Sequence, residues 1–264
     1  MTLALITGLG DLPRHLAAAC ETPPLVCAFE GTTPAGLAPD LTFRLETLGT
    51  LLVALGERGV TEVCFAGGVD RPALDPSKLD EETRPLVPLF MEALAKGDDG
   101  ALSAAVDLFE RTGFTVHAAQ DVAPHLLAEG GVYSEAWPDA RTREDAAVGA
   151  AHIAEMGPRD IGQACIVRAG QVVAMEDRAG TDAMIAGAGP FGPGAPALLF
   201  KGPKPQQSRR IDLPTVGPET IGAAAAAGLA AVVIDAGGVL VLDRDRCAAL
   251  ADAHGLIFWA RTGE

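Results

Sequence analysis

Four cations stand close together in a chain that is acidic elsewhere. The 264 residues carry a formal charge of −15, yet Lys201, Lys204, Arg209 and Arg210 fall within ten residues. No Asp or Glu occurs in residues 183–211. Because the sign of the charge reverses locally, the pattern indicates an anionic partner, and the Pro and Gly content of this segment predicts a loop.

Carboxylates flank this basic loop on both sides. Asp212 follows the cations directly, and Asp182 precedes the uncharged stretch as the last residue of the Gly180-Thr181-Asp182 tripeptide. A diphosphate with bound Mg²⁺ requires this combination, because cations neutralise phosphate oxygens while a carboxylate holds the metal or orients a water molecule. Two other interpretations stay open here. The loop can be a solvated segment fixed by surface ion pairs, and the tripeptide can be a helix cap without a further role.

Short motifs occur in a definite order along the whole chain. They are residues 8–13 (GLGDLP), 160–163 (DIGQ), 180–185 (GTDAMI), Lys204-Pro205, and 210–214 (RIDLP) with Gly217. In this order and spacing the chain resembles the cytoplasmic UDP-2,3-diacylglucosamine pyrophosphatases of lipid A biosynthesis, the family unrelated to the metallophosphoesterase type. That family usually has a carboxylate where this chain has Ala179, and another where it has Ser208.

The resemblance implies a Mg²⁺-dependent hydrolase that cleaves UDP-2,3-diacylglucosamine to UMP and 2,3-diacylglucosamine 1-phosphate. Asp212 is then expected as the Mg²⁺ ligand or as the base that orients the attacking water, and Asp182 as the second catalytic carboxylate. Lys201, Lys204 and Arg210 are the candidates that hold the diphosphate. The full expected set of substrate-binding residues is Gly8, Leu9, Gly10, Asp11, Gly67, Gly68, Gly180, Thr181, Lys201, Lys204 and Arg210.

Two glycine pairs follow apolar runs in the first part of the chain. Gly8-Leu9-Gly10 predicts a turn into a helix whose exposed backbone N–H groups form an anion or uridine site, and Gly67-Gly68 ends a later run. An NAD-dependent oxidoreductase is the alternative for such a turn, and Glu30 at the end of the second run keeps it open. Against it, Pro13 stands in place of the third glycine of the motif, and Glu46 is too distant to bind the ribose.

Other catalytic motifs are missing from the sequence. The five histidines show no metal-ligand spacing, and neither a GxSxG elbow nor a Walker lysine occurs. The five cysteines form no CxxC pair, which favours reduced thiols. The negative charge argues against nucleic acid as a partner. A non-catalytic nucleotide- or lipid-binding protein is a further alternative to the hydrolase.

Neither a targeting signal nor a membrane span is expected. The N-terminus has no basic region and reaches Gly8 too early for a signal peptide, so we expect a cytoplasmic protein. Residues 221–242 carry one charge, at Asp235, but Gly228 and Gly237-Gly238 divide them, which predicts a helix and two strands instead of a membrane span. The expected partner is a small glycolipid nucleotide. Peripheral contact with the inner face of the inner membrane and a homodimer both stay open.

Apolar runs alternate with helical patterns, which predicts an α/β fold of two domains. Residues 1–130 are expected to form a Rossmann-like domain with a parallel sheet covered on both faces. Its predicted strands are residues 3–7, 25–29, 63–66 and 114–118, and its predicted helices are residues 11–20, 45–59, 85–96 and 100–112. The domain boundary is expected at residues 130–138.

Residues 134–264 are expected to form a catalytic α/β domain with a mixed sheet. Its predicted strands are residues 165–167, 172–175, 198–201, 231–235, 239–242 and 256–259, the first two forming a hairpin. Its predicted helices are residues 141–156, 181–186, 219–227 and 244–254.

Overall fold

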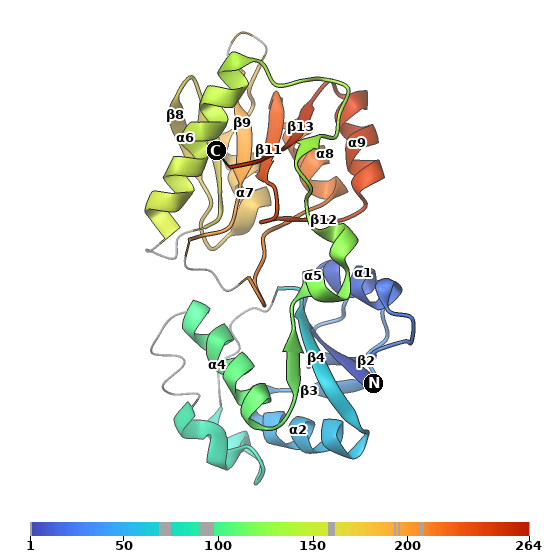
Figure 1. Cartoon of the computed structure of the whole chain (residues 1–264). Helices are drawn as coiled ribbons and strands as arrows, with labels where there is room; N and C mark the ends of the chain where they lie inside the picture. Colours follow the sequence, from blue (N-terminus) through green and yellow to red (C-terminus); the bar gives the residue numbers. More distant parts are fainter. Residues whose placement is uncertain are drawn as a thin grey trace. The chain divides into compact units, whose positions relative to one another are not determined.

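The computed structural model describes residues 2–68, 75–89, 98–157, 162–192, 194, 196–205 and 209–263. The chain forms two compact units (Figure 1). The first comprises Met1–Pro124 together with Ser208–Ile211, and the second comprises His125–Gln207 and Asp212–Glu264. Both units are α/β, so the predicted fold class is confirmed. No sequence pattern predicted that part of the basic loop belongs to the first unit.

The first unit is built on a five-stranded parallel sheet in the order β3-β2-β1-β4-β5. Its strands are β1 (Thr2–Thr7), β2 (Leu25–Phe29), β3 (Leu41–Phe43), β4 (Val60–Ala66) and β5 (Thr115–His117). Its described helices are α1 (Leu12–Ala19), α2 (Leu48–Glu57), α4 (Asp98–Arg111) and α5 (Ala119–Val122), with 3-10 turns at η1 (Leu45–Thr47), η2 (Pro76–Lys78) and η3 (Arg84–Leu86). The parallel, Rossmann-like arrangement was predicted from the apolar runs.

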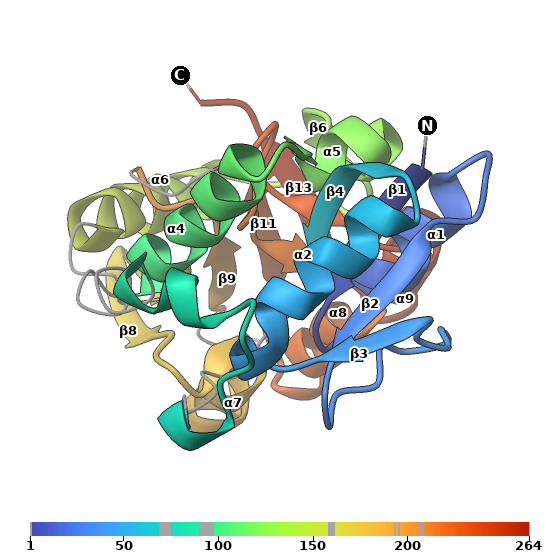
Figure 2. The same ribbon diagram turned by 90° about the horizontal axis from the view of Figure 1, so that it is seen from below.

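Successive side chains of β1 point to opposite faces of this sheet. Ala4 and Ile6 pack into a cluster with the apolar residues of α2 and α4, and α2 lies across this face in Figure 2. Helix α1 contacts α5 and the strands β1 and β4, and α5 contacts β4. The expected helical stripe of α2 is confirmed, because its leucines at 48, 51, 52 and 55 are all buried.

The second unit holds a six-stranded mixed sheet in the order β6-β13-β11-β9-β7-β8. Its strands are β6 (Gly131–Val132), β7 (Ala164–Arg168), β8 (Gln171–Met175), β9 (Leu198–Lys201), β11 (Ala231–Asp235) and β13 (Ile257–Arg261). Strands β9, β11 and β13 run parallel, whereas β6, β7 and β8 pair antiparallel with their neighbours. A separate parallel pair joins β10 (Thr215–Val216) and β12 (Leu240–Val241).

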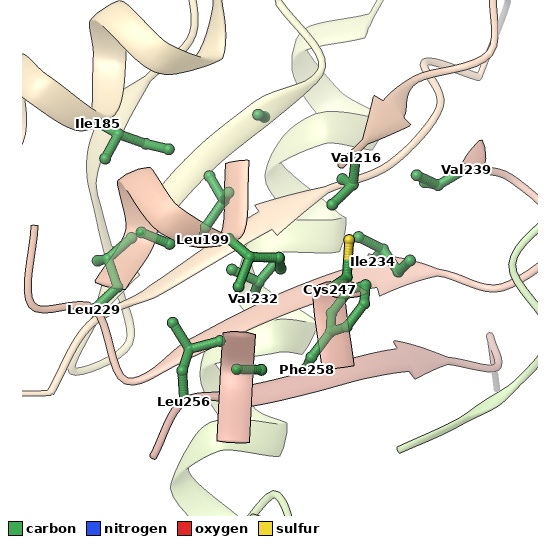
Figure 3. Packing of buried hydrophobic residues seen from close by; sticks show 14 of the residues in the cluster. Ile185, Leu199, Val216, Leu229, Val232, Ile234, Val239, Cys247, Leu256 and Phe258 are labelled. Carbon is green, nitrogen blue, oxygen red and sulfur yellow. The ribbon is translucent and has the colours of Figure 1, made fainter. Parts of the chain in front are cut away.

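Helices cover both faces of this mixed sheet. They are α6 (Ala140–Met156), α7 (Gly180–Ala188), α8 (Pro218–Ala226) and α9 (Arg244–Ala253). A 3-10 turn, η4 (Pro124–Leu126), spans the point in the chain where the first unit ends and the second begins. On β9, Leu198 and Phe200 join the cluster on the α6 face, whereas Leu199 joins the cluster shared with α7, α8 and α9 (Figure 3). Lys201, two residues after Leu199, therefore points to the α7 and α8 side.

Several sequence predictions differ from the structure in detail. The helix predicted at 45–59 is divided into η1 and α2, and the three-residue strand β3 and two-residue strands β6 and β10 were not predicted. Such short strands carry too few residues to show an alternating pattern. Most of the helix predicted at 85–96, and the motif residues 160, 161 and 208, lie outside the described residues.

The stretch that resembled a membrane span is divided as predicted. Residues 221–242 contain most of α8 followed by β11 and β12. Within the described ranges, no helix is both long and apolar enough to cross a membrane. All five cysteines are free thiols.

Candidate active site

The candidate site of the second unit is centred on Lys201, the last residue of β9. Its side chain is buried, at 7% exposure. Lys201 Nζ donates a hydrogen bond to Thr181 Oγ1 at 2.9 Å and another to the carbonyl oxygen of Thr215 at 3.0 Å. Lys201 thus joins the end of β9 to the start of α7 and to β10. Two of the predicted substrate-binding residues, Lys201 and Thr181, are therefore in direct contact.

Glu176 completes this buried network, and the sequence analysis did not identify it. Thr181 Oγ1 donates to Glu176 Oε1 at 2.5 Å, and the backbone N–H of Gln163 donates to Glu176 Oε2 at 2.7 Å. Gly162 has a φ of +58°, and a Cβ there would lie 2.3 Å from the Glu176 carbonyl oxygen. A glycine is required at this close approach. Lys201 donates to Thr181 and Thr181 donates to Glu176, so the buried hydroxyl both accepts and donates a hydrogen bond.

Burial and charge act in opposite directions on Lys201. Burial lowers the pKa of Lys201 below its ordinary value of 10.5, and the carboxylates of Glu176, Asp182 and Asp212 counteract part of that shift. All three carboxylates therefore act electrostatically on the same ammonium. The two catalytic candidates, Asp182 and Asp212, belong to the same unit as Lys201, and both carboxylates favour its charged form.

Helix α7 positions Thr181 and Asp182. Its N-cap is Ala179, which makes no side-chain cap, and Gly180 has a φ of +88° that favours glycine. The alternative that the Gly-Thr-Asp tripeptide caps the helix is therefore wrong, because the Thr181 hydroxyl is engaged with Lys201 and Glu176 instead. Asp182 is exposed in the first turn of α7, where the helix dipole favours a negative charge.

The cations of the basic loop belong to two different units. Lys204 lies three residues beyond Lys201 in the second unit, where the loop packs on the end of α6: a Cβ at Gly157 would lie 2.5 Å from Pro205. Arg210 belongs to the first unit. Its Nη2 contacts Glu110 Oε1 at 2.5 Å and donates to the Val116 carbonyl oxygen at 3.0 Å. The role of Arg210 as a diphosphate clamp stays a prediction.

The glycine-rich turns of the first unit bond to one another. The N–H of Gly8 donates to the Ala66 carbonyl at 2.8 Å, and Leu9 and Gly68 exchange N–H···O bonds at 2.7 and 3.0 Å. A Cβ at Gly67 would lie 2.4 Å from the Leu9 carbonyl oxygen. The backbone N–H groups of Gly8, Leu9 and Gly68 are therefore used within these turns.

Two further residues of the same turn, Gly10 and Asp11, lead into α1. Gly10 has a φ of +93°, and Asp11 at the start of α1 pairs with Arg14 at 3.0 Å. Binding of substrate by these turns stays a prediction.

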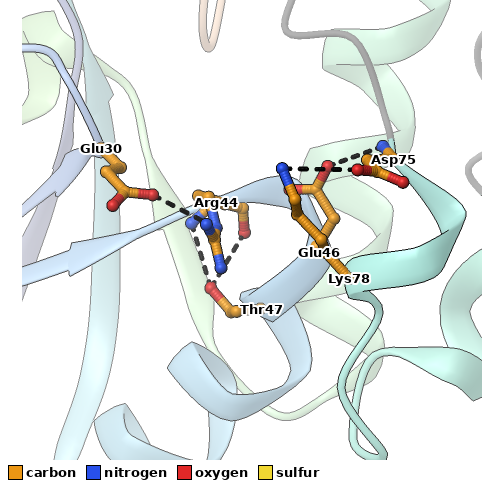
Figure 4. Close-up of polar contacts among 6 residues, drawn as sticks. All are labelled: Glu30, Arg44, Glu46, Thr47, Asp75 and Lys78. Carbon is orange, nitrogen blue, oxygen red and sulfur yellow. Dashed lines mark hydrogen bonds and ion pairs between the residues drawn. The ribbon is translucent and has the colours of Figure 1, made fainter.

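Glu30 and Glu46, the two carboxylates considered for the oxidoreductase alternative, both contact other residues of the first unit (Figure 4). Glu30 pairs with Arg44 at 3.2 Å, and the buried Glu46 accepts a hydrogen bond from the Asp75 N–H at 2.7 Å. Arg44 is held in turn by Thr47, whose hydroxyl accepts from the Arg44 N–H at 3.0 Å. Glu30 is exposed, and its contact with Arg44 is a surface ion pair.

The fold and these contacts define a two-domain α/β protein with a lysine-centred site at the carboxyl end of a parallel strand, where such sheets bind ligands. Family models described as LpxI N-terminal domain and LpxI C-terminal domain match residues 2–126 and 129–259. The chain belongs to the LpxI family. It is 35% identical over 266 residues to UDP-2,3-diacylglucosamine pyrophosphatase LpxI of Caulobacter vibrioides. The aligned region covers 96% of this chain and 95% of that relative. The resemblance found from the motifs is confirmed.

Replacement of the Thr181 hydroxyl should destabilise the second unit. Thr181→Val keeps the shape of the side chain but leaves Lys201 without one acceptor and Glu176 without one donor. We expect the free energy of unfolding to fall by about 1–3 kcal/mol, the usual effect of a buried polar group without its partner. Urea unfolding measures this change. Thr181→Ser, which retains the hydroxyl, is the control, and equal stability of the two variants would contradict the assigned network.

Proposed function

We propose that this protein hydrolyses the diphosphate of UDP-2,3-diacylglucosamine and releases UMP and 2,3-diacylglucosamine 1-phosphate in lipid A biosynthesis. Membership of the LpxI family and the activity of the Caulobacter relative support this substrate. The observation that carries the proposal is the buried Lys201 ammonium, fixed by Thr181 and Thr215 beside two catalytic candidate carboxylates.

Lys201 supplies the fixed positive charge of the proposed reaction. An ammonium has three N–H donors, and two of those on Lys201 bond to Thr181 and Thr215. We assign the third to a phosphate oxygen of the substrate. Because the network holds the ammonium in place before substrate arrives, little reorganisation is needed when charge develops on that oxygen.

Asp212 is the proposed base. The oxygen of a water molecule forms a bond to one phosphorus while the bond from that phosphorus to the bridging oxygen breaks, and Asp212 accepts the proton of the water. Asp182, at the start of α7, is the second carboxylate and orients the water or the Asp212 side chain. Positioning and charge neutralisation contribute most of the rate in such a transfer.

The carboxylates of the candidate site would bind Mg²⁺ together with the phosphates of the substrate. Among the residues that the structure describes, no group of three or more His, Cys, Asp or Glu side chains could hold a metal ion. Mg²⁺ is commonly bound through one or two carboxylates, several waters and substrate phosphates, and Asp212 fits that role. We therefore propose Asp212 as the residue that would hold Mg²⁺, which neutralises charge on the diphosphate when bound.

Release of UMP tests the proposal directly. Purified protein is incubated with UDP-2,3-diacylglucosamine in detergent, with Mg²⁺ or with EDTA, and UMP is quantified by chromatography. We expect release with Mg²⁺ and none with EDTA. Binding of the substrate without release in either condition would favour a non-catalytic carrier. A fluorescence titration that shows NAD(H) binding would favour the oxidoreductase.

A further inference from the structure

We propose that the groove between α7 and α8 receives one acyl chain of the substrate and limits the length of chain that the protein accepts. This inference rests on the proposed hydrolase function. The two helices contact one another in the second unit and border a cavity of about 350 Å³. The groove and the candidate active site lie in the same compact unit.

The chemistry of the groove lining selects a hydrocarbon. Asp182 is the one charged residue of the lining, and it is exposed. The rest is apolar and includes Ile185, Ala186, Ala223, Ala226 and Ala227. A uracil ring or a sugar buried there would lose hydrogen bonds to water without replacement, whereas a hydrocarbon chain requires no polar partner.

Small side chains create the space. Three alanines, Ala223 and Ala226 of α8 and Ala227 at its C-cap, line the groove. A larger side chain at any of these positions would fill part of it. Ile185, at 2% exposure, forms part of its wall. The volume lies at the small end of the range for ligand pockets, which suits one chain rather than two.

Asp182 relates the groove to the candidate active site, because it lines the groove and directly follows Thr181, whose hydroxyl bonds to Lys201. The Asp182 carboxylate also acts electrostatically on Lys201. A substrate whose diphosphate is bound at Lys201 therefore has an apolar surface on α7, the helix whose Thr181 contacts Lys201. The place of Asp182 in the groove lining, next to Thr181, is the reason to assign the groove to the substrate rather than to a second copy of the chain.

The test is to fill the groove and measure chain-length preference. Ala223→Leu and Ala226→Leu, singly and together, place larger side chains in the groove, and Ala249→Leu on the exposed face of α9 is the matched control. kcat/KM is measured for UDP-2,3-diacylglucosamine with long acyl chains and for an analogue with acetyl groups. Each buried methylene contributes about fourfold to binding, so exclusion of about three should lower kcat/KM for the long-chain substrate roughly fiftyfold.

The outcomes separate the inference from the function on which it rests. A selective loss on the long-chain substrate, with the acetyl analogue and the Ala249→Leu control unchanged, supports the groove. Equal losses on both substrates, or no loss, overturn it while the hydrolase function stands. No hydrolysis of either substrate by the unmodified protein overturns both.

Two further measurements examine the occupant of the groove. A change of mass by light scattering in the leucine variants, without a change in chain-length preference, would identify the groove as an interface between copies and overturn the assignment. A photoreactive group at the end of the acyl chain should label peptides from residues 180–190 and 218–227. Labelling confined to other peptides overturns the assignment.

Discussion

Asp212→Asn is expected to lower kcat about a thousandfold while the protein remains folded and binds substrate. The amide keeps the size of the side chain but cannot accept the proton of the attacking water, and it is a poor ligand for Mg²⁺. A positioned general base contributes typically about 10²–10⁴-fold to the rate, and loss of a metal ligand adds to the effect. UMP release at saturating substrate measures kcat, and substrate binding to the variant is measured by calorimetry.

A matched control removes the same charge elsewhere in the second unit. Asp245, exposed in the first turn of α9, is replaced in Asp245→Asn, and its kcat should equal that of the unmodified protein. Circular dichroism confirms that both variants fold. If folded Asp212→Asn retains near-normal kcat, Asp212 is neither the base nor the required metal ligand, and Asp182 becomes the first candidate.

Much of the fold could be predicted because its signals are local and repeated. Buried parallel strands appear as continuous apolar runs, and β2, β9 and β11 have the bounds that these runs predict. The hairpin of β7 and β8 follows from a turn at Ala169-Gly170, where both residues have positive φ. Short strands such as β10 depend on pairing partners distant in the chain, which no local pattern reveals.

The candidate site could be predicted only in part. Reversal of charge identified Lys201 and Asp212, because an acidic chain seldom gathers cations without a reason. It also grouped Arg210 with them, although Arg210 bonds to Glu110 in the first unit. Proximity in sequence could not distinguish cations that the fold assigns to different units.

Glu176 was not found because Lys201, the residue on which it acts, is distant in the sequence. It lies directly after β8, and it contacts Lys201 only through Thr181, five residues later in the chain. A useful signal was nevertheless present. Where the family usually has a carboxylate, this chain has Ala179, and Glu176 stands three residues earlier, close enough to prompt the search for another acid.

Replacement of Lys201 should remove the fixed positive charge of the site. Lys201→Met keeps an unbranched side chain of similar length in the buried position but has no donor for Thr181, for Thr215 or for the substrate phosphate. Loss of one fixed donor in a site of this kind typically lowers kcat about 10²–10³-fold. Lys78→Met, on an exposed lysine of the first unit, is the control and should leave kcat unchanged.

The pH dependence distinguishes this role from a general loss of packing. Because the pKa of Lys201 is lowered in the folded protein, the ammonium loses its proton below pH 10.5, and kcat/KM of the unmodified protein should fall there. Over the same range the unfolded chain still binds that proton, so the contribution of Lys201 to the free energy of unfolding rises with pH. The unmodified protein should therefore gain stability relative to Lys201→Met while it loses activity. Urea unfolding and UMP release between pH 7 and about pH 11 measure both trends. A stability difference that does not change with pH would show that Lys201 titrates alike in the folded and unfolded states, and would contradict its assignment as a buried, charged clamp.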